Sequence, residues 1–386
     1  MILGAVLGEE AAAAMRVTGV EMHLCEFPLK APFRIAYADW NVMPSVVCRI
    51  VTDDGIEGLG EGVPDPEVTG ETLEATLAVL TYDLAPLLIG RDPRDIEAMM
   101  KAFRARVRGV PTAVATLEIA MNDLVGKAYG IPAHRLYGGR TAADLDLFHV
   151  VSLGSPDEMA ESAAAAMAEG YRGLKLKLGG GTELDEVARV SAVRSAVGDD
   201  VPVKIDANQG WGTPARAIHL IRRLERFAPV WVEQPIAQWN LEGLAEVRSR
   251  VDVPIMADEA VHDARDLMAI IRLRAADLIN VKLMKCGGVS QAMQLIHIAG
   301  SAGLAVQIGS MVESGIASMA GAHLAAARPE VVSLETSGPL LFSADGVDSP
   351  IKAPRFHVTD APGLGVRLTD EFPSLVRRSV VIGDVV

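Results

Sequence analysis

The chain has 386 residues, half of them hydrophobic, which is enough for two domains with sizeable cores. Its net charge is −14 and it has no basic stripe or arginine-rich arm, which argues against nucleic acid as a partner. The three cysteines have neither metal-binding nor disulfide spacing, and no apolar run is long enough to span a membrane, so we expect a cytoplasmic protein with reduced thiols.

Residues 1–15 precede the first patterned segment. They combine a short apolar stretch, two glutamates and an alanine run, without the basic region of a signal peptide. We expect a disordered extension here.

The stretch 16–140 is predicted to form an α+β domain. Asp53-Asp54-Gly55 is a turn signal that predicts a hairpin between the runs on either side. Thr69-Gly70-Glu71-Thr72 opens the first of three helical stretches, which end near Gly130. The strand-like runs are 17–28, 45–52 and 56–60.

From about residue 145 strand-like and helix-like segments alternate, with a period of about 25 residues. The strand-like runs are apolar on both faces, which is typical of a parallel sheet covered on both sides. Eight such runs with seven helices between them predict a closed α/β barrel over 141–347. A doubly wound open sheet is the alternative, but no glycine-rich phosphate loop follows the first strand. The segment 348–386 is expected to pack back on the first domain. The predicted strands are 147–152, 173–178, 202–206, 229–233, 254–258, 277–282, 304–309 and 331–335, and the predicted helices are 156–169, 183–197, 214–227, 241–250, 263–273, 288–301 and 315–327.

Five charged residues lie near the ends of successive strands, 24 to 29 residues apart. Because parallel strands point their C-terminal ends at one rim, these side chains are expected to share a cavity. They are Lys177, Asp206, Glu233, Asp258 and Lys282.

The three acids of this set predict a site for one Mg²⁺ ion. A single acid after a strand is usually a helix cap, but three on consecutive strands are a better match for a hard cation. No His or Cys joins them, which disfavours zinc. Asn208 and Glu259 lie beside the predicted ligands and are expected to orient them or to contact substrate.

The lysines predict acid/base chemistry. Lys175 and Lys177 alternate along a strand and so point to one side, where one ammonium would lower the pKa of the other. A pair that extends outward from the strand end is the alternative. Lys282 lies in an apolar strand across the barrel from Lys177, and two bases on opposite faces of one carbon allow inversion. Glu335, after the last strand, is either a surface cap or a partner for a lysine or the substrate.

A proton beside a carboxylate is very weakly acidic, because its removal creates a dianion. A divalent metal stabilises such an enediolate, and a lysine base paired with Mg²⁺ is a known solution.

The chain resembles the enolase superfamily, and within it the muconate-lactonising-enzyme-like subgroup of the mandelate racemase/muconate lactonizing enzyme family. The likeness runs from about Arg16 over nearly the whole chain. It rests on Lys175-Leu176-Lys177, Asp206-Ala207-Asn208, Glu233-Gln234-Pro235, Asp258-Glu259 and Asn280-Val281-Lys282, with Asp123-Leu124-Val125-Gly126-Lys127 in the first domain.

The resemblance implies a modified (β/α)7β barrel with an α+β capping domain. It also implies Mg²⁺ on Asp206, Glu233 and Asp258, with Lys177 and Lys282 as acid/base catalysts and Lys175 assisting Lys177. The subgroup includes cycloisomerases, o-succinylbenzoate synthases, N-acylamino acid racemases and dipeptide epimerases.

Thr69-Gly70-Glu71, Lys282-Leu283-Met284-Lys285 and the run 309–314 are similar to dipeptide epimerases. Two features depart from that pattern. Ser333-Leu334-Glu335 replaces the Asp-x-Asp of those enzymes, and the spacing to Gly338-Pro339 is more similar to muconate cycloisomerases. The stretch 36–39 has no basic residue, which argues against an acidic substrate side chain. Residues 34–40 and 63–66 are expected to set specificity.

The leading hypothesis is therefore a Mg²⁺-dependent racemase or epimerase that acts on a small carboxylate, either a dipeptide or an N-substituted amino acid. A muconate-type cycloisomerase or an o-succinylbenzoate-synthase-like lyase is the alternative. A non-catalytic binding module would have no need for two opposed bases. Neither a nucleic acid nor a membrane is an expected partner, and enzymes of this type are often homo-oligomers.

Overall fold

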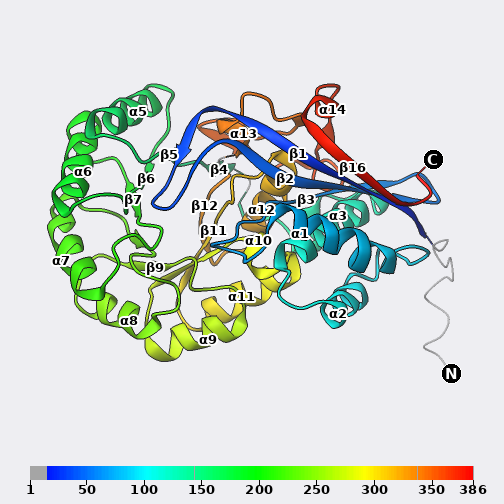
Figure 1. The fold of residues 1–386 in the computed structure, drawn as a ribbon, viewed down its shortest axis with the longest axis horizontal. Coiled ribbons are helices and arrows are strands. Elements are labelled where there is room, and N and C mark those ends of the chain that lie inside the picture. The colour runs from blue at the N-terminus through cyan, green and yellow to red at the C-terminus, as the bar shows by residue number, and fades with distance from the viewer. Residues whose placement is uncertain (1–14, 143, 337, 386) are drawn as a thin grey trace.

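The computed structural model describes residues 15–142, 144–336 and 338–385. An antiparallel sheet with its helices lies beside a ring of alternating strands and helices (Figure 1). Nearly all of the extension predicted at residues 1–15 lies outside the described residues. No described helix is both long and apolar enough to cross a membrane.

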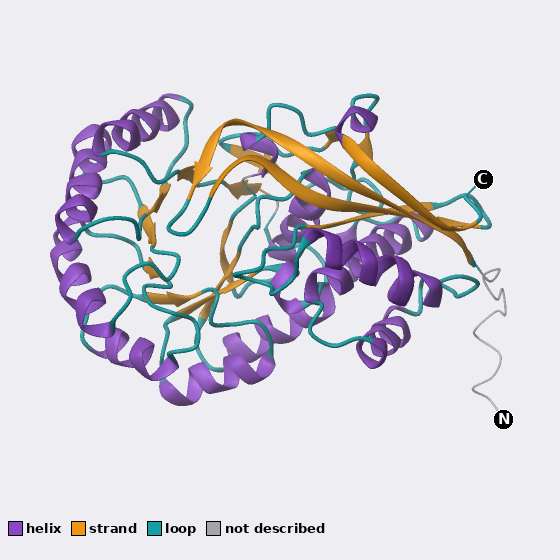
Figure 2. Cartoon of the chain, viewed as in Figure 1, coloured by secondary structure: helices purple, strands orange, loops and turns teal. Residues whose placement is uncertain are grey.

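The capping domain is built on a four-stranded antiparallel sheet with the order β16-β1-β2-β3. One edge strand of this sheet, β16, comes from the C-terminal end of the chain. It pairs with β1 from Gly19↔Gly383 to Cys25↔Val376. The first two strands extend beyond their predicted ends and pair again at Phe33↔Trp40. This hairpin reaches over the mouth of the barrel (Figure 2). The strands are β1 (Val17–Arg34), β2 (Asp39–Thr52), β3 (Glu57–Gly62) and β16 (Val376–Gly383).

Three alternating glycines on β3 let a buried helix pack directly on the sheet. A Cβ atom on Gly58, Gly60 or Gly62 would come within 2.2 Å of the backbone or side chains of α3 (Pro111–Ala128). The Gly-x-Gly-x-Gly pattern is therefore a close-approach site. The other helices of this domain are α1 (Leu73–Val79), α2 (Ile96–Arg106) and α4 (Ala133–Leu136).

Eight strands form one parallel sheet in the sequential order β5 to β12, curled into a barrel. The strands lie inside and the helices form the outer layer (Figure 2). The strands are β5 (His149–Val151), β6 (Leu174–Lys177), β7 (Val203–Asp206), β8 (Val232–Glu233), β9 (Ile255–Ala257), β10 (Leu278–Val281), β11 (Ala305–Ile308) and β12 (Val331–Leu334). The helices are α5 (Pro156–Ala168), α6 (Glu183–Val197), α7 (Pro214–Leu224), α8 (Leu241–Ser249), α9 (Ala264–Leu273), α10 (Leu283–Cys286), α11 (Val289–Ser301) and α12 (Gly315–Ala327).

The predicted α/β barrel with an α+β capping domain is confirmed, and each predicted barrel strand and helix has its counterpart. The alternative of a doubly wound open sheet is wrong, because neighbouring strands follow sequence order around the sheet. The last segment contains α13 (Gly338–Leu341), α14 (Phe372–Leu375) and two small ladders. These pair β4 (Asp144–Asp146) with β14 (Arg355–His357), and β13 (Val347–Asp348) with β15 (Arg367–Leu368).

Candidate active site

The rim at the C-terminal ends of the barrel strands gathers the predicted charged residues. Lys177, Asp206 and Glu233 are the last residues of β6, β7 and β8, and in register they stand side by side. Asp258 and Lys282 follow β9 and β10 directly. Parallel register is what brings residues so far apart in sequence to one level of the barrel.

The three acids form a cluster suited to a hard cation. One carboxylate oxygen from each of Asp206, Glu233 and Asp258 lies within 4.8 Å of the others, and all three side chains are fully buried. Glu233 Oε2 and Asp258 Oδ2 form ion pairs with Lys175 and Lys282 but meet no other donor in the described residues. Oxygen donors at this spacing with unused lone pairs fit Mg²⁺.

Lys175 lies beneath this cluster. Its Nζ is 3.0 Å from Asp206, 2.9 Å from Glu233 and 3.0 Å from Glu335. Burial alone would lower the pKa of Lys175, but these carboxylates raise it well above its ordinary value. Lys175 is thus a fixed positive charge among acids, and its predicted effect on the pKa of Lys177 stays a prediction.

Lys177 and Lys282 flank the cluster. Lys177 Nζ is 2.7 Å from Asp206 Oδ2, and Lys282 Nζ is 2.7 Å from Asp258 Oδ2. In the sheet their strands are separated by β7, β8 and β9. Both side chains line one cavity, together with Asn208 and Glu335. The structure therefore brings the two predicted bases to one space from different sides.

Asp206 and Asp258 are kept ionised by these lysines. Burial would raise the pKa of Asp206, but Lys175 and Lys177 lower it well below its ordinary value. Lys282 and Lys285 do the same for Asp258. Glu233 differs, because burial and the neighbouring Asp206 raise its pKa. A metal ligand must be deprotonated, so a bound cation would reverse this last shift.

Asn208 and Glu259 form a bridge next to the ligands. Asn208 Nδ2 donates to Glu259 Oε1 at 3.2 Å, and Asn208 Oδ1 accepts from Lys177 at 3.2 Å. Asn208 has φ +40° and Gln234 has φ +36°, so the backbone is strained directly after two of the strands.

Three further side chains that contact the acid cluster were not among the predicted site residues. Lys285 Nζ donates to Asp258 Oδ1 at 2.5 Å, and Asn280 Nδ2 donates to Glu233 Oε1 at 2.8 Å. Gln234 Oε1 accepts from the backbone of Asp258 at 2.9 Å. Asn280 lies two residues before Lys282, and this alternation could have predicted that both side chains point to the same side of the strand. Lys285 lies on the short α10. The only sequence signal for it was that a lysine in an apolar run is rare.

The capping domain closes the cavity from above. Its contribution is mostly apolar and comes from the β1–β2 hairpin and the loop after β3. The lining residues from this domain are Phe33, Ile35, Tyr37, Trp40, Met43, Pro44, Val63, Pro64, Asp65 and Val68.

Comparisons with known proteins agree with this architecture. Residues 18–138 match the mandelate racemase/muconate lactonizing enzyme N-terminal domain, and residues 158–372 match the enolase C-terminal domain-like family. The chain belongs to the mandelate racemase/muconate lactonizing enzyme family. The predicted membership is thereby confirmed.

Relatives within this family are racemases, epimerases and cycloisomerases. The N-succinyl-L-Arg/Lys racemase of Bacillus cereus is 39% identical over 92% of this chain and 96% of its own length, and its crystal structure superposes with a TM-score of 0.93. The dipeptide epimerase of Cytophaga hutchinsonii, solved with Mg and D-Ala-L-Val, has a TM-score of 0.91 at 30% identity, covering 95% of this chain and 100% of that one. Muconate cycloisomerase 1 of Rhodococcus opacus is 31% identical over 92% of this chain and 96% of its own length. The prediction of an isomerase of the racemase and epimerase type is confirmed.

Proposed function

We propose that this protein is a Mg²⁺-dependent racemase or epimerase that inverts the α-carbon of an N-substituted amino acid or dipeptide. The observation that carries the proposal is the pair Lys177 and Lys282. Each is held 2.7 Å from a different carboxylate of one buried cluster, and both open on one cavity.

The two lysines would exchange a proton through the substrate. A neutral lysine on one side removes the α-proton, and the ammonium on the other side returns a proton to the opposite face. Asp206, Glu233 and Asp258 would hold Mg²⁺, which supplies positive charge to the substrate carboxylate as negative charge develops on it. The apolar lid excludes water from the reacting carbon.

Solvent exchange tests this function. The Mg²⁺-loaded protein would be incubated in D₂O with pooled N-succinylamino acids, N-acylamino acids and dipeptides, and products followed by mass spectrometry. We expect a gain of one mass unit and inversion in a subset. A pool that stays free of deuterium while cis,cis-muconate is converted to a lactone would contradict the proposal.

We further propose that the substrate side chain is cationic, as in the N-succinyl-L-Arg/Lys racemase. Among the described capping-domain residues that line the cavity, only Asp65 is charged. Its Oδ1 accepts from the backbone of Glu67 at 2.8 Å, which fixes the carboxylate, and Tyr37 Oη donates to Oδ2 at 3.4 Å. Burial and then Asp65 raise the pKa of Tyr37, so the phenol stays neutral beside it. Oδ2 is thus available for a substrate ammonium or guanidinium.

Asp65→Asn tests this preference. We expect kcat/KM for N-succinyl-Arg and N-succinyl-Lys to fall by about 10- to 100-fold, the value of a charge-assisted hydrogen bond, with little change for N-succinyl-norleucine. Glu97→Gln is the control, because Glu97 is an exposed acid on α2 of the same domain and does not line the cavity. An equal loss for charged and neutral substrates would refute the assignment of Asp65 without affecting that of the lysines.

A cycloisomerase is the second candidate. It is favoured by Glu335 in the place of an Asp-x-Asp motif and by the muconate cycloisomerase relatives. The Asp-x-Asp motif would then be absent because the substrate of a cycloisomerase has no ammonium group to bind. The solvent-exchange assay above decides between the two.

A further inference from the structure

A second concave site lies on the outside of the molecule, between the capping domain and the barrel. It is bounded by the end of α2, the loop to α3, the first turn of α9 and α10, and has a volume of about 710 Å³. This lies within the usual size range of small-molecule sites. No residue lines both this groove and the substrate cavity, but Lys285 connects the two sites, because it lines the groove and donates to Asp258.

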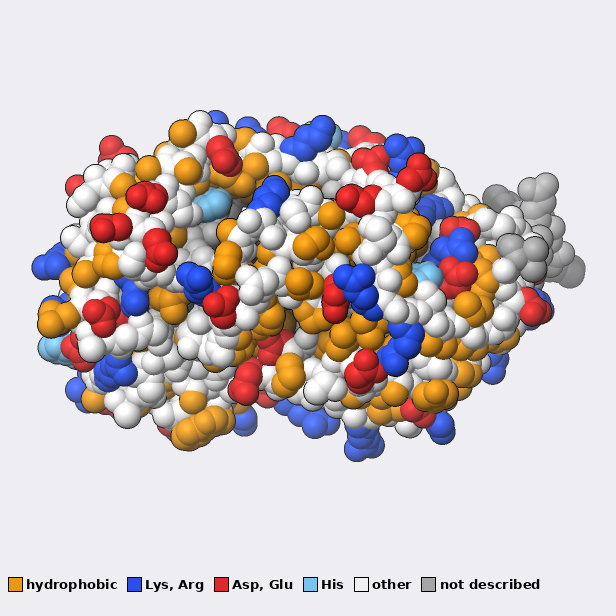
Figure 3. All heavy atoms as spheres, turned by 45° about the horizontal axis from the view of Figure 1, so that its top comes forward, with side chains coloured by type: hydrophobic (Ala, Val, Ile, Leu, Met, Phe, Trp, Pro, Cys, Tyr) orange, Lys and Arg blue, Asp and Glu red, His pale blue; other side chains and the backbone are white. Residues whose placement is uncertain are grey.

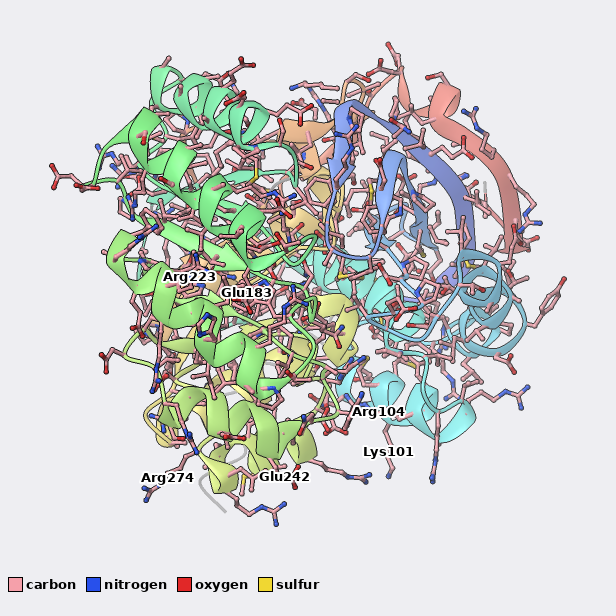
Figure 4. The ribbon with its side chains drawn as sticks, turned by 60° about the vertical axis from the view of Figure 1, so that its left-hand side comes forward. Lys101, Arg104, Glu183, Arg223, Glu242 and Arg274 are labelled. Atoms are coloured by element: carbon pink, nitrogen blue, oxygen red, sulfur yellow. The ribbon has the colours of Figure 1, made fainter. Side chains whose placement is uncertain are left out.

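Three arginines from two domains converge on this groove. Arg104 and Arg108 come from the capping domain, and Arg265 comes from the barrel. Within the described parts of the chain none of the three lies within 4.0 Å of a carboxylate, whereas nearby Arg106 pairs with Asp83 at 2.8 Å. On the face in Figure 3, by contrast, acidic and basic side chains are interspersed. Figure 4 shows Arg104 at the boundary between α2 and the barrel helices.

The positive charge of Arg265 stands at an unfavourable position for a cation. It lies in the first turn of α9, where the helix dipole disfavours a positive side chain. The acid beside it, Asp263, is already used as the helix cap and accepts from Arg265 N and Asp266 N. The groove therefore has excess positive charge in a protein of net charge −14.

The base of the groove is apolar. Val107, Val110 and Pro111 are half-buried and Val114 is buried behind them. An occupant that used the whole groove would need an anionic group for the arginines and an apolar group for these side chains.

We propose that this groove binds a phosphate monoester with an apolar or aromatic ester group. A phosphate monoester carries a charge of about −1.5 to −2 at neutral pH and three acceptor oxygens, which suits several guanidinium groups at once. The ester group would pack on Val107, Val110 and Pro111.

Calorimetric titration of the Mg²⁺-loaded protein with phenyl phosphate and with inorganic phosphate tests this site. We expect saturable one-to-one binding, tighter for phenyl phosphate. Reversing two charges, Arg104→Glu with Arg265→Glu, should weaken binding by at least about tenfold, because charge-assisted contacts are lost. Arg272→Glu, an exposed change on the same helix, should leave binding unchanged.

Three results would overturn the proposal. Undiminished binding in the double variant would place the phosphate elsewhere, most simply on Mg²⁺. An equal loss of phosphate binding in Arg272→Glu would mean that the effect comes from the overall charge of the protein and not from this groove. A change of oligomeric state in the double variant would show that a second copy occupies the groove. Circular dichroism melts of all variants verify that they fold.

Discussion

Two sets of buried carboxylates in this molecule have opposite electrostatic environments. At the barrel rim, Asp206 and Asp258 lie within 3.0 Å of lysine ammonium groups, which lower their pKa values despite burial. At the interface between the domains, Glu61 and Glu118 are equally buried, and no described lysine, arginine or histidine forms an ion pair with either of them. Burial raises the pKa of each to about 7.

Glu61 and Glu118 connect the two domains by hydrogen bonds. Glu61 accepts from Ser314 Oγ at 2.7 Å and from Ala317 N at 3.1 Å at the start of α12. Glu118 accepts from Ser290 N at 3.0 Å in the first turn of α11. Each thus attaches the capping domain to the N-terminus of a barrel helix. The difference teaches that burial alone favours protonation of a carboxylate, and that the adjacent lysines keep Asp206 and Asp258 ionised.

The largest effect is expected from removing a rim lysine. Lys177→Ala or Lys282→Ala should reduce racemisation by about 10²- to 10⁴-fold, the usual contribution of a positioned acid or base. Each variant should still exchange the α-proton of the one enantiomer that faces the remaining lysine. Proton NMR of each pure enantiomer in D₂O measures this, and calorimetry should find Mg²⁺ binding preserved. Full racemisation in either variant would mean that the lysines are only ion-pair partners.

The next largest effect is expected where a rim acid loses one of its two lysines. Lys285→Met leaves Asp258 with Lys282 alone, and breaking a buried ion pair costs about 3–5 kcal/mol in the free energy of unfolding. Mg²⁺ should recover part of this loss by replacing the missing charge. Urea unfolding with Mg²⁺ and with EDTA measures both values.

The matched control for that change is Lys101→Met, an exposed lysine on α2 (Figure 4). Equal stability of Lys285→Met and the unaltered protein in EDTA would argue that Lys285 does not support Asp258.

A smaller effect is expected at the interface. Glu61 titrates at about 7 when folded, against 4.5 in the unfolded chain, so between these values the folded protein binds more protons. The free energy of unfolding therefore falls as the pH rises through this window, by about 3 kcal/mol for such a group. Glu61→Gln should make the fall shallower.

Urea unfolding at several pH values from about pH 5 to about pH 7 measures the slope. Glu242→Gln, on the exposed side of α8 (Figure 4), should leave it unchanged. An unaltered slope in Glu61→Gln would indicate that this carboxylate stays charged at the interface.

The local sequence pattern was sufficient to predict the strands and helices of the barrel and the charged residues at its rim. The run 173–178 contains β6 (Leu174–Lys177), and the helix predicted at 183–197 is α6 itself. Because parallel strands end at one rim, knowing that Asp206 and Glu233 end neighbouring strands was enough to place them together. Capping signals such as Thr182 with Asp185 fix where such helices begin.

Contacts between distant elements were not predictable in this way. The β1–β2 hairpin continues past Pro28, where Phe33 pairs with Trp40. The segment 348–386 was expected to pack on the first domain, but not that β16 would pair with β1 across more than 350 residues. Asp65 and Lys285 acquire their places in the site from the docking of the loop after β3 and from α10.

The sequence by itself thus determined the succession of strands and helices and the acids and lysines at the strand ends, since periodicity and chain direction are local properties. Only the tertiary structure decided which lysine pairs with which carboxylate, which residues of the capping domain line the cavity and which acids connect the two domains. Those outcomes depend on distances of a few ångströms between segments that no local pattern connects.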